Sequence, residues 1–202
     1  MAKIVDHDER RTEILRKAIR LFSETGYQQV TFQQLAGVCG LSRTAFYRYF
    51  KSKREIFDGT ITLLMQEIAD EVRLQMSRTS RLDAAKKLTL MLEYGVDTCL
   101  RYQRLVQTII EYLIDLRRQG EPVERKILRH TASYRYAVNK IIKEGIASGE
   151  FRQVSPSGAT DMLFAMLQAV VIKIMFYDDL DRNRLMKHCK IIVTSLRANG
   201  GE

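Results

Sequence analysis

The chain has 202 residues, of which 46% are hydrophobic and 28% charged, so it can form one or two packed domains and is not a mainly disordered chain. Only two prolines and eleven glycines interrupt it, which favours long helices over a sandwich of short strands. The net charge of +9 favours nucleic acid or an anionic membrane surface as partner, while the isolated Cys39, Cys99 and Cys189 exclude a disulfide framework or a C-x-x-C zinc site.

Two helices are predicted near the N-terminus. From Glu9 to Glu24 the apolar residues recur at helical spacing, and Gly26 then provides a C-terminal stop. Thr31 to Gln34 has the form of a capping box, in which a threonine hydroxyl and a glutamine side chain satisfy each other's backbone amides. A short second helix should therefore run from this box to about Cys39.

A glycine turn follows the second helix. Gly40 can adopt the left-handed conformation that a sharp turn needs, and Ser42 can cap a third helix. Phe46 and Phe50 lie four residues apart on that helix and should both point inward. Two short helices around such a turn predict a helix-turn-helix motif over residues 31–50.

A long fourth helix begins at a second capping box, Ser52 to Glu55, and its apolar positions continue towards Ser77. The clearest later breaks are Gly120 to Pro122 and Ser155 to Gly158. Between and after them we expect five more helices, at about Leu82–Tyr102, Leu105–Gln119, Val123–Ser148, Gly158–Tyr177 and Leu180–Arg197. The run Val170 to Ile174 could be a strand, but no second β-rich run exists to pair with it. An all-α fold is therefore predicted.

Neither a leader nor a membrane span is expected. Met1 to Arg11 is charged rather than apolar. The most apolar stretch, Met162 to Tyr177, contains Gln168 and Lys173 and is too short to cross a hydrocarbon core of about 30 Å comfortably. A buried helix, no membrane partner and a reducing cytoplasmic location are the resulting predictions.

The segment Thr31 to Phe50, TFQQLAGVCGLSRTAFYRYF, and the following KSKREIF resemble the DNA-binding signature of the tetracycline-repressor (TetR) family. The matching positions occur in the family's order and are Thr31, Leu35, Ala36, Gly40, Leu41, Ser42, Phe46, Tyr47, Tyr49, Phe50, Ser52, Lys53 and Glu55. Residues Ile141 to Arg152 show a looser similarity. Thr44 departs from the family, which usually has glycine or alanine there, so the target sequence stays open.

The resemblance implies a bacterial transcriptional regulator with two domains. The first, over residues 8–68, would be a three-helix helix-turn-helix domain that binds DNA. The second, over residues 69–202, would be a larger helical domain for effector binding and dimerisation. The expected function is repression, with release from the operator by a small hydrophobic effector.

A recognition helix turns one face into its own domain and offers donors and acceptors to base edges on the other. With the two phenylalanines inward, Arg43, Thr44 and Arg48 are left outward. Arg43, near the start of the helix, can form two hydrogen bonds with guanine, and Ala45 is small enough to meet a thymine methyl group. We therefore expect Arg43 and Thr44 to read bases.

By the family resemblance, Thr31, Tyr47, Tyr49 and Lys53 match positions that contact or lie near phosphate, and such contacts set the register of the protein on DNA. The full set of predicted DNA-binding residues is Thr31, Ser42, Arg43, Thr44, Ala45, Tyr47, Arg48, Tyr49 and Lys53. The alternative is that the cations of this segment form only a solvated basic face.

The predicted helix Gly158 to Tyr177 is apolar on nearly every side, and such a helix must be covered on every side. Neighbours within the chain can cover one side and a second subunit the other. The last helix, with a stripe of Leu185, Cys189, Ile192 and Leu196, would join it in a four-helix homodimer interface like that of the family. A homodimer requires a near-palindromic operator; the alternative is burial inside a larger monomer.

The effector pocket is expected around the central helix Leu82 to Tyr102, where Gly95 could permit close approach of a ligand. The predicted pocket residues are Tyr94, Thr98, Cys99, Tyr112, Tyr134 and Met162, although ordinary packing is an alternative for each of them. An apolar pocket with a few polar anchors is the general expectation.

Other classes of function have less support. The three histidines are scattered, and the sequence lacks an E-x-x-H pair, a glycine-rich phosphate loop and a nucleophile elbow, so neither an enzyme nor a cofactor or metal is expected. A helical adaptor or membrane-surface protein could also use basic amphipathic helices. Within the family, a ligand-independent regulator or an activator is the main alternative.

Overall fold

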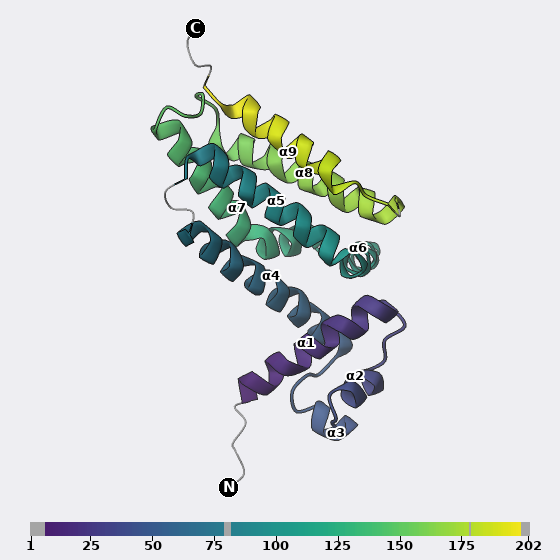
Figure 1. Cartoon of the computed structure of the whole chain (residues 1–202). Helices are drawn as coiled ribbons and strands as arrows, with labels where there is room; N and C mark the ends of the chain where they lie inside the picture. The colour runs from purple at the N-terminus through teal and green to yellow at the C-terminus, as the bar shows by residue number, and fades with distance from the viewer. Residues whose placement is uncertain (1–6, 79–81, 178, 199–202) are drawn as a thin grey trace. The chain divides into compact units, whose positions relative to one another are not determined.

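The computed structural model describes residues 7–78, 82–177 and 179–198 (Figure 1). Residues 1–6, on which the expectation of no leader partly rests, lie outside this range. The helices are α1 (His7–Thr25), α2 (Phe32–Val38), α3 (Arg43–Phe46), α4 (Lys53–Arg78), α5 (Ala84–Arg101), α6 (Gln103–Arg118), α7 (Val123–Ala147), α8 (Pro156–Phe176) and α9 (Arg182–Leu196). In the described ranges the only β-type pairing is an isolated bridge between Phe151 and Arg197. The predicted all-α fold is confirmed.

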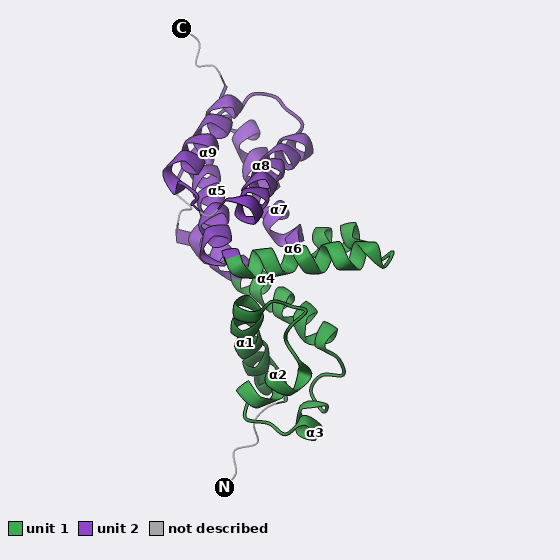
Figure 2. Cartoon of the chain, turned by 90° about the vertical axis from the view of Figure 1, so that its right-hand side faces the viewer, with its two compact units in different colours: residues 1–67, 104–130 green, residues 68–103, 131–202 purple. Residues whose placement is uncertain are grey.

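The chain forms two compact units (Figure 2). Unit 1 comprises residues 1–67 and 104–130, and unit 2 comprises residues 68–103 and 131–202. Helix α6 and the start of α7 therefore belong with the N-terminal helices. The expected functional boundary after residue 68 stays a prediction.

In unit 1, helix α1 buries Ile14, Ala18 and Phe22, which follow one another at intervals of four residues. The chain leaves this helix at Gly26, whose φ of 87° is a left-handed conformation that favours glycine. The predicted stop is therefore confirmed.

An aromatic cluster and a polar network attach residues 104–130 to unit 1. The ring of Tyr112, on α6, lies 4.6 Å from that of Tyr27 and 4.9 Å from that of Phe57. Its hydroxyl donates to Asp58 Oδ1 over 2.9 Å, and Lys126 Nζ donates to the same oxygen over 2.6 Å. Burial, followed by the Asp58 carboxylate, raises the pKa of Tyr112, so its hydroxyl remains a donor.

In unit 2, α8 and α9 lie along α5 (Figure 1). Helix α9 buries Leu185, Met186, Cys189, Val193 and Leu196 against its neighbours. The predicted stripe is confirmed except at Ile192, which is half-buried, because Val193 takes the inward position. Helix α8 begins two residues earlier than predicted because Ser155 caps it and Pro156 suits the first helical position.

The segment 145–152 fixes the start of α5. Both carboxylate oxygens of Glu150 accept backbone amides of that helix, from Ala84 at 2.7 Å and from Ala85 at 2.8 Å. The negative charge also suits the positive end of the helix dipole. Phe151 packs against Gly145, while Ala198 N donates to the backbone oxygen of Glu150 over 2.9 Å. The Ile141 to Arg152 segment thus connects α5, α7 and α9 through these contacts.

Gly145→Ala should destabilise the protein, although the same change usually stabilises a helix. A Cβ at Gly145 would overlap the ring of Phe151 and lie 2.9 Å from the Cβ of Ala84. Overpacking of this kind costs about 1–3 kcal/mol. Gly37→Ala is the matched control, because no atom lies within 4 Å of its added Cβ. We expect that control to gain about 0.5–1 kcal/mol from the better helix former.

Urea unfolding followed by circular dichroism measures both variants. Equal changes in the free energy of unfolding for Gly145→Ala and Gly37→Ala would contradict the close packing at Phe151.

Candidate nucleic-acid interface

Each turn of the predicted helix-turn-helix is built from local hydrogen bonds. The Thr31 hydroxyl accepts from Gln34 N over 3.2 Å, and the Gln34 side chain accepts from Thr31 N over 2.8 Å, so the capping box is confirmed. Gly40 has the predicted left-handed conformation, with a φ of 66°. Ser42 Oγ accepts from Ala45 N over 3.1 Å and caps α3.

Helix α3 is shorter than predicted. It ends at Phe46, and the chain continues in tighter turns, with Tyr49 N donating to Phe46 O over 3.0 Å. The carbonyl oxygens of Tyr47 and Tyr49 accept from the side chains of Lys51 and Arg11 instead of from further helix amides. The inward direction of Phe46 and Phe50 is nevertheless confirmed, since both are fully buried.

The second capping box, at Ser52 to Glu55, forms only in part. Ser52 Oγ accepts from Glu55 N over 3.1 Å as predicted. The Glu55 carboxylate accepts instead from Lys51 N over 2.7 Å, one residue before the expected partner. This bond still fixes the chain as it enters α4.

The residues predicted to read bases lie on the outer side of α3. Arg43 and Thr44 are exposed, Ala45 is half-exposed, and Arg48 is exposed in the turn that follows. Neither arginine forms an ion pair with another residue in the described ranges. Both guanidinium groups therefore keep their donors for an external acceptor.

A series of aromatic contacts supports Arg43 from the core outward. Phe32 meets the buried Phe46 edge to face at 4.9 Å, and Tyr47 stacks on Phe32 at 4.5 Å. The guanidinium of Arg43 lies 5.8 Å from the centroid of the Tyr47 ring. Stacking restricts the arginine before any partner binds, which reduces the entropy lost on binding.

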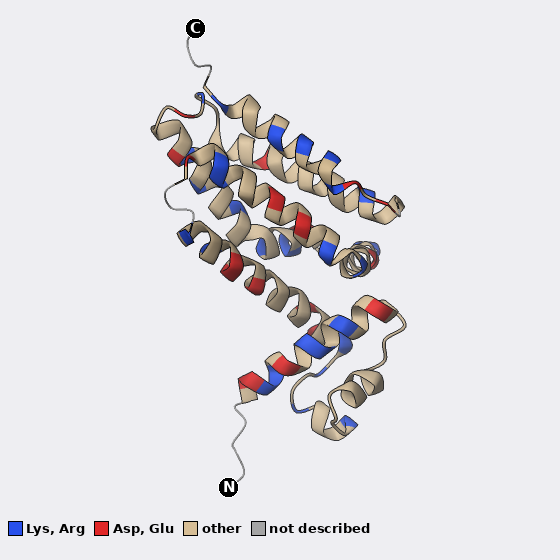
Figure 3. Cartoon of the chain, viewed as in Figure 1, with Lys and Arg blue, Asp and Glu red and all other residues tan. Residues whose placement is uncertain are grey.

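The helix-turn-helix segment carries only positive charges. No aspartate or glutamate occurs between Gly26 and Arg54, whereas the same segment has five lysines and arginines. In Figure 3, α2 and α3 accordingly carry no acidic positions, while α1 carries both signs. A surface of this kind favours the phosphates of a nucleic acid.

Two residues predicted to lie near phosphate are engaged within the protein. Lys53 Nζ donates to the carbonyl oxygens of Tyr27 at 2.8 Å and Gln28 at 3.1 Å, and burial lowers its pKa. Tyr49 stacks on His7 at 4.9 Å. Thr31 and Tyr47 remain exposed, so the phosphate roles of all four stay predictions.

Arg11 has a supporting role that the sequence did not reveal. Its guanidinium donates to the carbonyl oxygen of Tyr49, pairs with Glu55 at 3.3 Å and lies 4.2 Å from the centroid of Phe50. It thereby joins α1 to the end of the recognition segment and the start of α4. Helical spacing places Arg11 on a polar face but gives no sign of a partner so distant in the chain.

Three predicted pocket residues, Tyr94, Thr98 and Cys99, lie half-buried on α5, and the fourth, Tyr134, lies on α7. The Tyr134 hydroxyl donates to the carbonyl oxygen of Met91. Burial raises the pKa of the Cys99 thiol to about 11, so it remains protonated. Tyr134 thus lies beside the Met91 and Gly95 face of α5, whereas Tyr94 lines a groove towards the end of α4.

Gly95 permits a close approach, as predicted, but by a protein side chain. A Cβ there would lie 2.7 Å from the Tyr134 hydroxyl oxygen and 3.2 Å from a methyl carbon of Leu167. The Tyr134 ring also meets Phe164 edge to face at 5.7 Å. Tyr134 therefore occupies the space beside Gly95 in which a ligand was predicted.

The two other pocket candidates lie elsewhere. Tyr112 is in the aromatic cluster of unit 1, and Met162 is 69% exposed on α8. A groove of about 240 Å³ does reach Tyr94, between the end of α4 and α5, with Met76 and Met91 in its wall and Lys87 and Asp97 at its edge. Among the described residues, no group of three histidine, cysteine or acidic side chains could hold a metal ion.

Helix α8 leaves an apolar seam in solvent, which we define as Met162, Ala165, Ala169, Ile172 and Phe176. These positions are three or four residues apart and so share one face. Ile172 is 59% exposed and Phe176 79% exposed, whereas Ile174 on the opposite face is 3% exposed. Neighbours in the chain thus cover only one side of α8.

Within the described ranges, α8 is also the one helix that is long and apolar enough, by length and composition, to cross a membrane.

Comparison with known families gives two matches along the chain. The family model described as "Bacterial regulatory proteins, tetR family" matches residues 14–60. The model described as "QacR-like protein, C-terminal region" matches residues 75–198, which is more than half of the chain.

Individual relatives are more distant. The chain is 24% identical over 161 residues to the "Fatty acid metabolism regulator protein" of Bacillus subtilis, a match that covers 79% of this chain and 80% of that protein. It is 33% identical over 105 residues to "Nucleoid occlusion factor SlmA" of Glaesserella parasuis, a match that covers 52% of this chain and 44% of that factor. The chain thus spans less than half the length of the factor.

Solved structures show the same fold. A TetR transcription regulator from Haloarcula marismortui superposes with a TM-score of 0.83 at 19% identity, covering 95% of this chain and 100% of that one. The regulator FadR from Bacillus subtilis, in complex with stearoyl-CoA, gives a TM-score of 0.75 at 22% identity, covering 92% of this chain and 98% of that one. At these identities the likeness concerns the fold alone.

Proposed function

Because the chain belongs to the TetR family of bacterial regulatory proteins and is therefore a DNA-binding transcriptional regulator, we propose that it is a repressor that a small hydrophobic effector releases from its operator. It would act in the cytoplasm as a homodimer. A reducing compartment suits the three cysteines, all of which are free thiols.

The outer surface of α3 carries the proposal of sequence-specific binding. It presents Arg43 and Thr44 near a capped helix start, in a segment without acidic residues. The N-terminal residues of a recognition helix are those that reach base edges in the major groove. We assign base reading to Arg43 and Thr44, with Ala45 against a thymine methyl, and phosphate contacts to Arg48.

The apolar seam on α8 supports the homodimer. Its exposed side chains, together with the 66% exposed Ile191 on α9, would cost free energy if they stayed in water. A second copy offers the same seam, and two-fold symmetry allows a patch to pair with itself. A symmetric dimer would bind a near-palindromic operator.

Helix α4 offers a route from effector to DNA. It is one continuous helix, with residues 53–67 in unit 1 and residues 68–78 in unit 2. Two recognition helices must lie about 34–36 Å apart to enter successive major grooves. A small rotation of α4 would change this spacing without any contact between effector and DNA.

We place the effector in unit 2, among Tyr94, Thr98, Cys99 and Tyr134. Gly95 lets Tyr134 fill that region, so binding would require the tyrosine to move aside and give up its bond to Met91. Mostly apolar walls with a few hydroxyl groups favour a hydrophobic molecule with a polar end. The complex of the structurally similar FadR with stearoyl-CoA agrees with this class of effector.

Effector and operator should weaken each other's binding by the same factor. Thermodynamic linkage requires this reciprocity, with a typical coupling of about 5–150-fold. Native mass spectrometry of the purified protein would identify a bound molecule, which is then titrated with and without saturating operator. Equal effector affinity in both titrations would contradict effector release and leave a ligand-independent regulator.

A further inference from the structure

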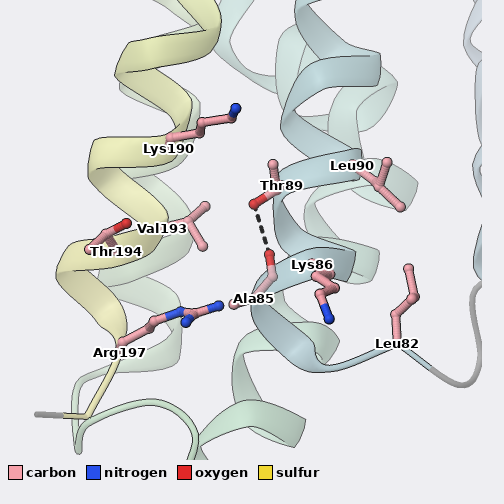
Figure 4. A pocket seen from close by; sticks show the side chains of 9 residues that line it. All are labelled: Leu82, Ala85, Lys86, Thr89, Leu90, Lys190, Val193, Thr194 and Arg197. Atoms are coloured by element: carbon pink, nitrogen blue, oxygen red, sulfur yellow. Dashed lines mark hydrogen bonds between the residues drawn. The ribbon is translucent and has the colours of Figure 1, made fainter. Parts of the chain in front are cut away.

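A second possible ligand site lies away from the proposed effector region, in a groove between the start of α5 and the end of α9 (Figure 4). Its volume is about 530 Å³. Sites for small molecules and cofactors commonly measure about 300–1,000 Å³. The groove is thus large enough for one small molecule.

Two stripes of side chains form the groove. On α9, Lys190, Val193 and Thr194 are spaced at three and four residues and share one face, and Arg197 follows directly after the helix. On the side of α5, Ala85 and Thr89 share a face in the same way. Glu150 accepts from the first amides of α5, and backbone bonds join residues 150 and 152 to the end of α9, so the same loop holds both walls.

The floor of the groove is apolar. Ala85 and Val193 are buried, at 2% and 3% exposure, and meet where the two stripes face each other. Leu82 and Leu90 extend this surface along the α5 side, where Leu90 is 42% exposed. An alkyl chain in the groove would cover mainly the surface of Leu90 and Leu82 that now faces water, because Ala85 and Val193 are already shielded.

The rim carries a surplus of positive charge. Three cations, Lys86, Lys190 and Arg197, line the groove. Two carboxylates lie near it: Asp83 pairs with Lys86 at 3.1 Å and also interacts with the charge of Arg197, and Glu150 accepts from Ala85 N. Neither Lys190 nor Arg197 has an ion-pair partner in the described part of the chain. Figure 4 shows both side chains extending from α9 towards α5, one on either side of Val193.

The hydroxyl groups in the groove differ in their availability. Thr89 Oγ1 already donates to Ala85 O over 2.8 Å. The Thr194 hydroxyl makes no hydrogen bond with another described residue and is exposed beside Arg197. Arg197 extends towards α5 in Figure 4, and its guanidinium suits carboxylate and phosphate geometry.

We propose that this groove binds a free, single-chain anionic amphiphile, an alkyl or acyl chain that ends in a carboxylate or phosphate. Arg197 holds the head group, Lys190 adds positive potential, and the chain lies along the exposed side chains of Leu82 and Leu90. A single groove of this volume accepts one chain rather than a bilayer surface. The site is additional to the effector region of the proposed function and does not depend on it.

Isothermal titration calorimetry of the intact protein tests the site with dodecanoate and dodecyl phosphate, both below their micelle concentrations. Each should bind, whereas dodecanol and inorganic phosphate should bind at least about tenfold more weakly, because each lacks one of the two contacts. Vesicles of phosphatidylglycerol should not compete with dodecanoate.

Arg197→Glu should weaken dodecanoate binding by about tenfold or more, and Lys190→Glu by several-fold. Lys187→Glu is the matched control on α9, because Lys187 is exposed but does not line the groove. The dodecanoate affinity of this variant should stay within about twofold of that of the wild-type protein. Circular dichroism of each variant establishes that it is folded.

Three results would overturn the proposal. They are unchanged dodecanoate affinity in both Arg197→Glu and Lys190→Glu, inorganic phosphate binding as tightly as dodecanoate, and binding to vesicles without binding to the free amphiphile. Unchanged affinity in both variants would place dodecanoate elsewhere in the protein, including the effector region.

Discussion

Replacing Arg43 by alanine is expected to cost about 1–3 kcal/mol of operator binding and to relax the preference at one base pair of each half-site. Arg43 is exposed, lies at the start of the capped α3 and forms no ion pair with another described residue. Its stacking contact with Tyr47 restricts it before DNA arrives. The loss should therefore concern one guanidinium whose motion is already restricted.

Arg48→Ala is the matched control for this experiment. Arg48 follows α3 in the tightened turn, further from the helix start that reaches base edges. Its removal should weaken all duplexes alike and lower the salt dependence of binding by about one counterion. Fluorescence anisotropy with single-base operator variants at fixed salt measures both proteins. An equal, sequence-independent loss for both would remove Arg43 from base reading.

Ile172→Glu should separate the dimer without unfolding the subunit. Ile172 lies in the middle of the apolar seam and is 59% exposed, so a carboxylate there is solvated in the monomer but would be buried in the dimer. Operator affinity should fall on the order of 100-fold, because the two half-sites would no longer be bound together. Sedimentation velocity at micromolar protein measures the assembly.

Two further variants distinguish this effect from general damage. Ile174→Glu places the charge on the opposite, buried face of α8 and should unfold the chain. Tyr136→Glu changes a 73% exposed residue on α7 and should leave the assembly unchanged. Sedimentation of the wild-type protein as a monomer, or of Ile172→Glu as a stable dimer, would contradict the interface on α8.

Local chemistry made much of the fold predictable. The Thr31 capping box, the left-handed Gly40 and the Ser42 cap each depend on residues within a few positions of one another, and each is confirmed. Periodicity also identified the inward phenylalanines of the recognition segment. Helix length was less predictable, because side chains from outside α3 take the carbonyl oxygens after Phe46.

Contacts between distant segments could not be predicted in this way. Nothing near Tyr112 in the sequence indicates that it packs in unit 1 beside Asp58, and the sequence analysis grouped it with the pocket. Helical periodicity similarly indicates that α8 is apolar but not which face the chain itself covers. Ile174 is buried within the subunit, whereas Ile172, two residues earlier, is exposed.

The most direct test of sequence-specific regulation is selection of bound duplexes from a random pool, followed by titration of the selected and scrambled duplexes at several salt concentrations. We expect a near-palindromic operator with half-site centres about 10–10.5 base pairs apart, or a multiple of that spacing. The affinity for this operator should exceed that for the scrambled duplex on the order of 10³-fold or more. No enrichment, or equal affinity for both duplexes at every salt concentration, would contradict sequence-specific binding.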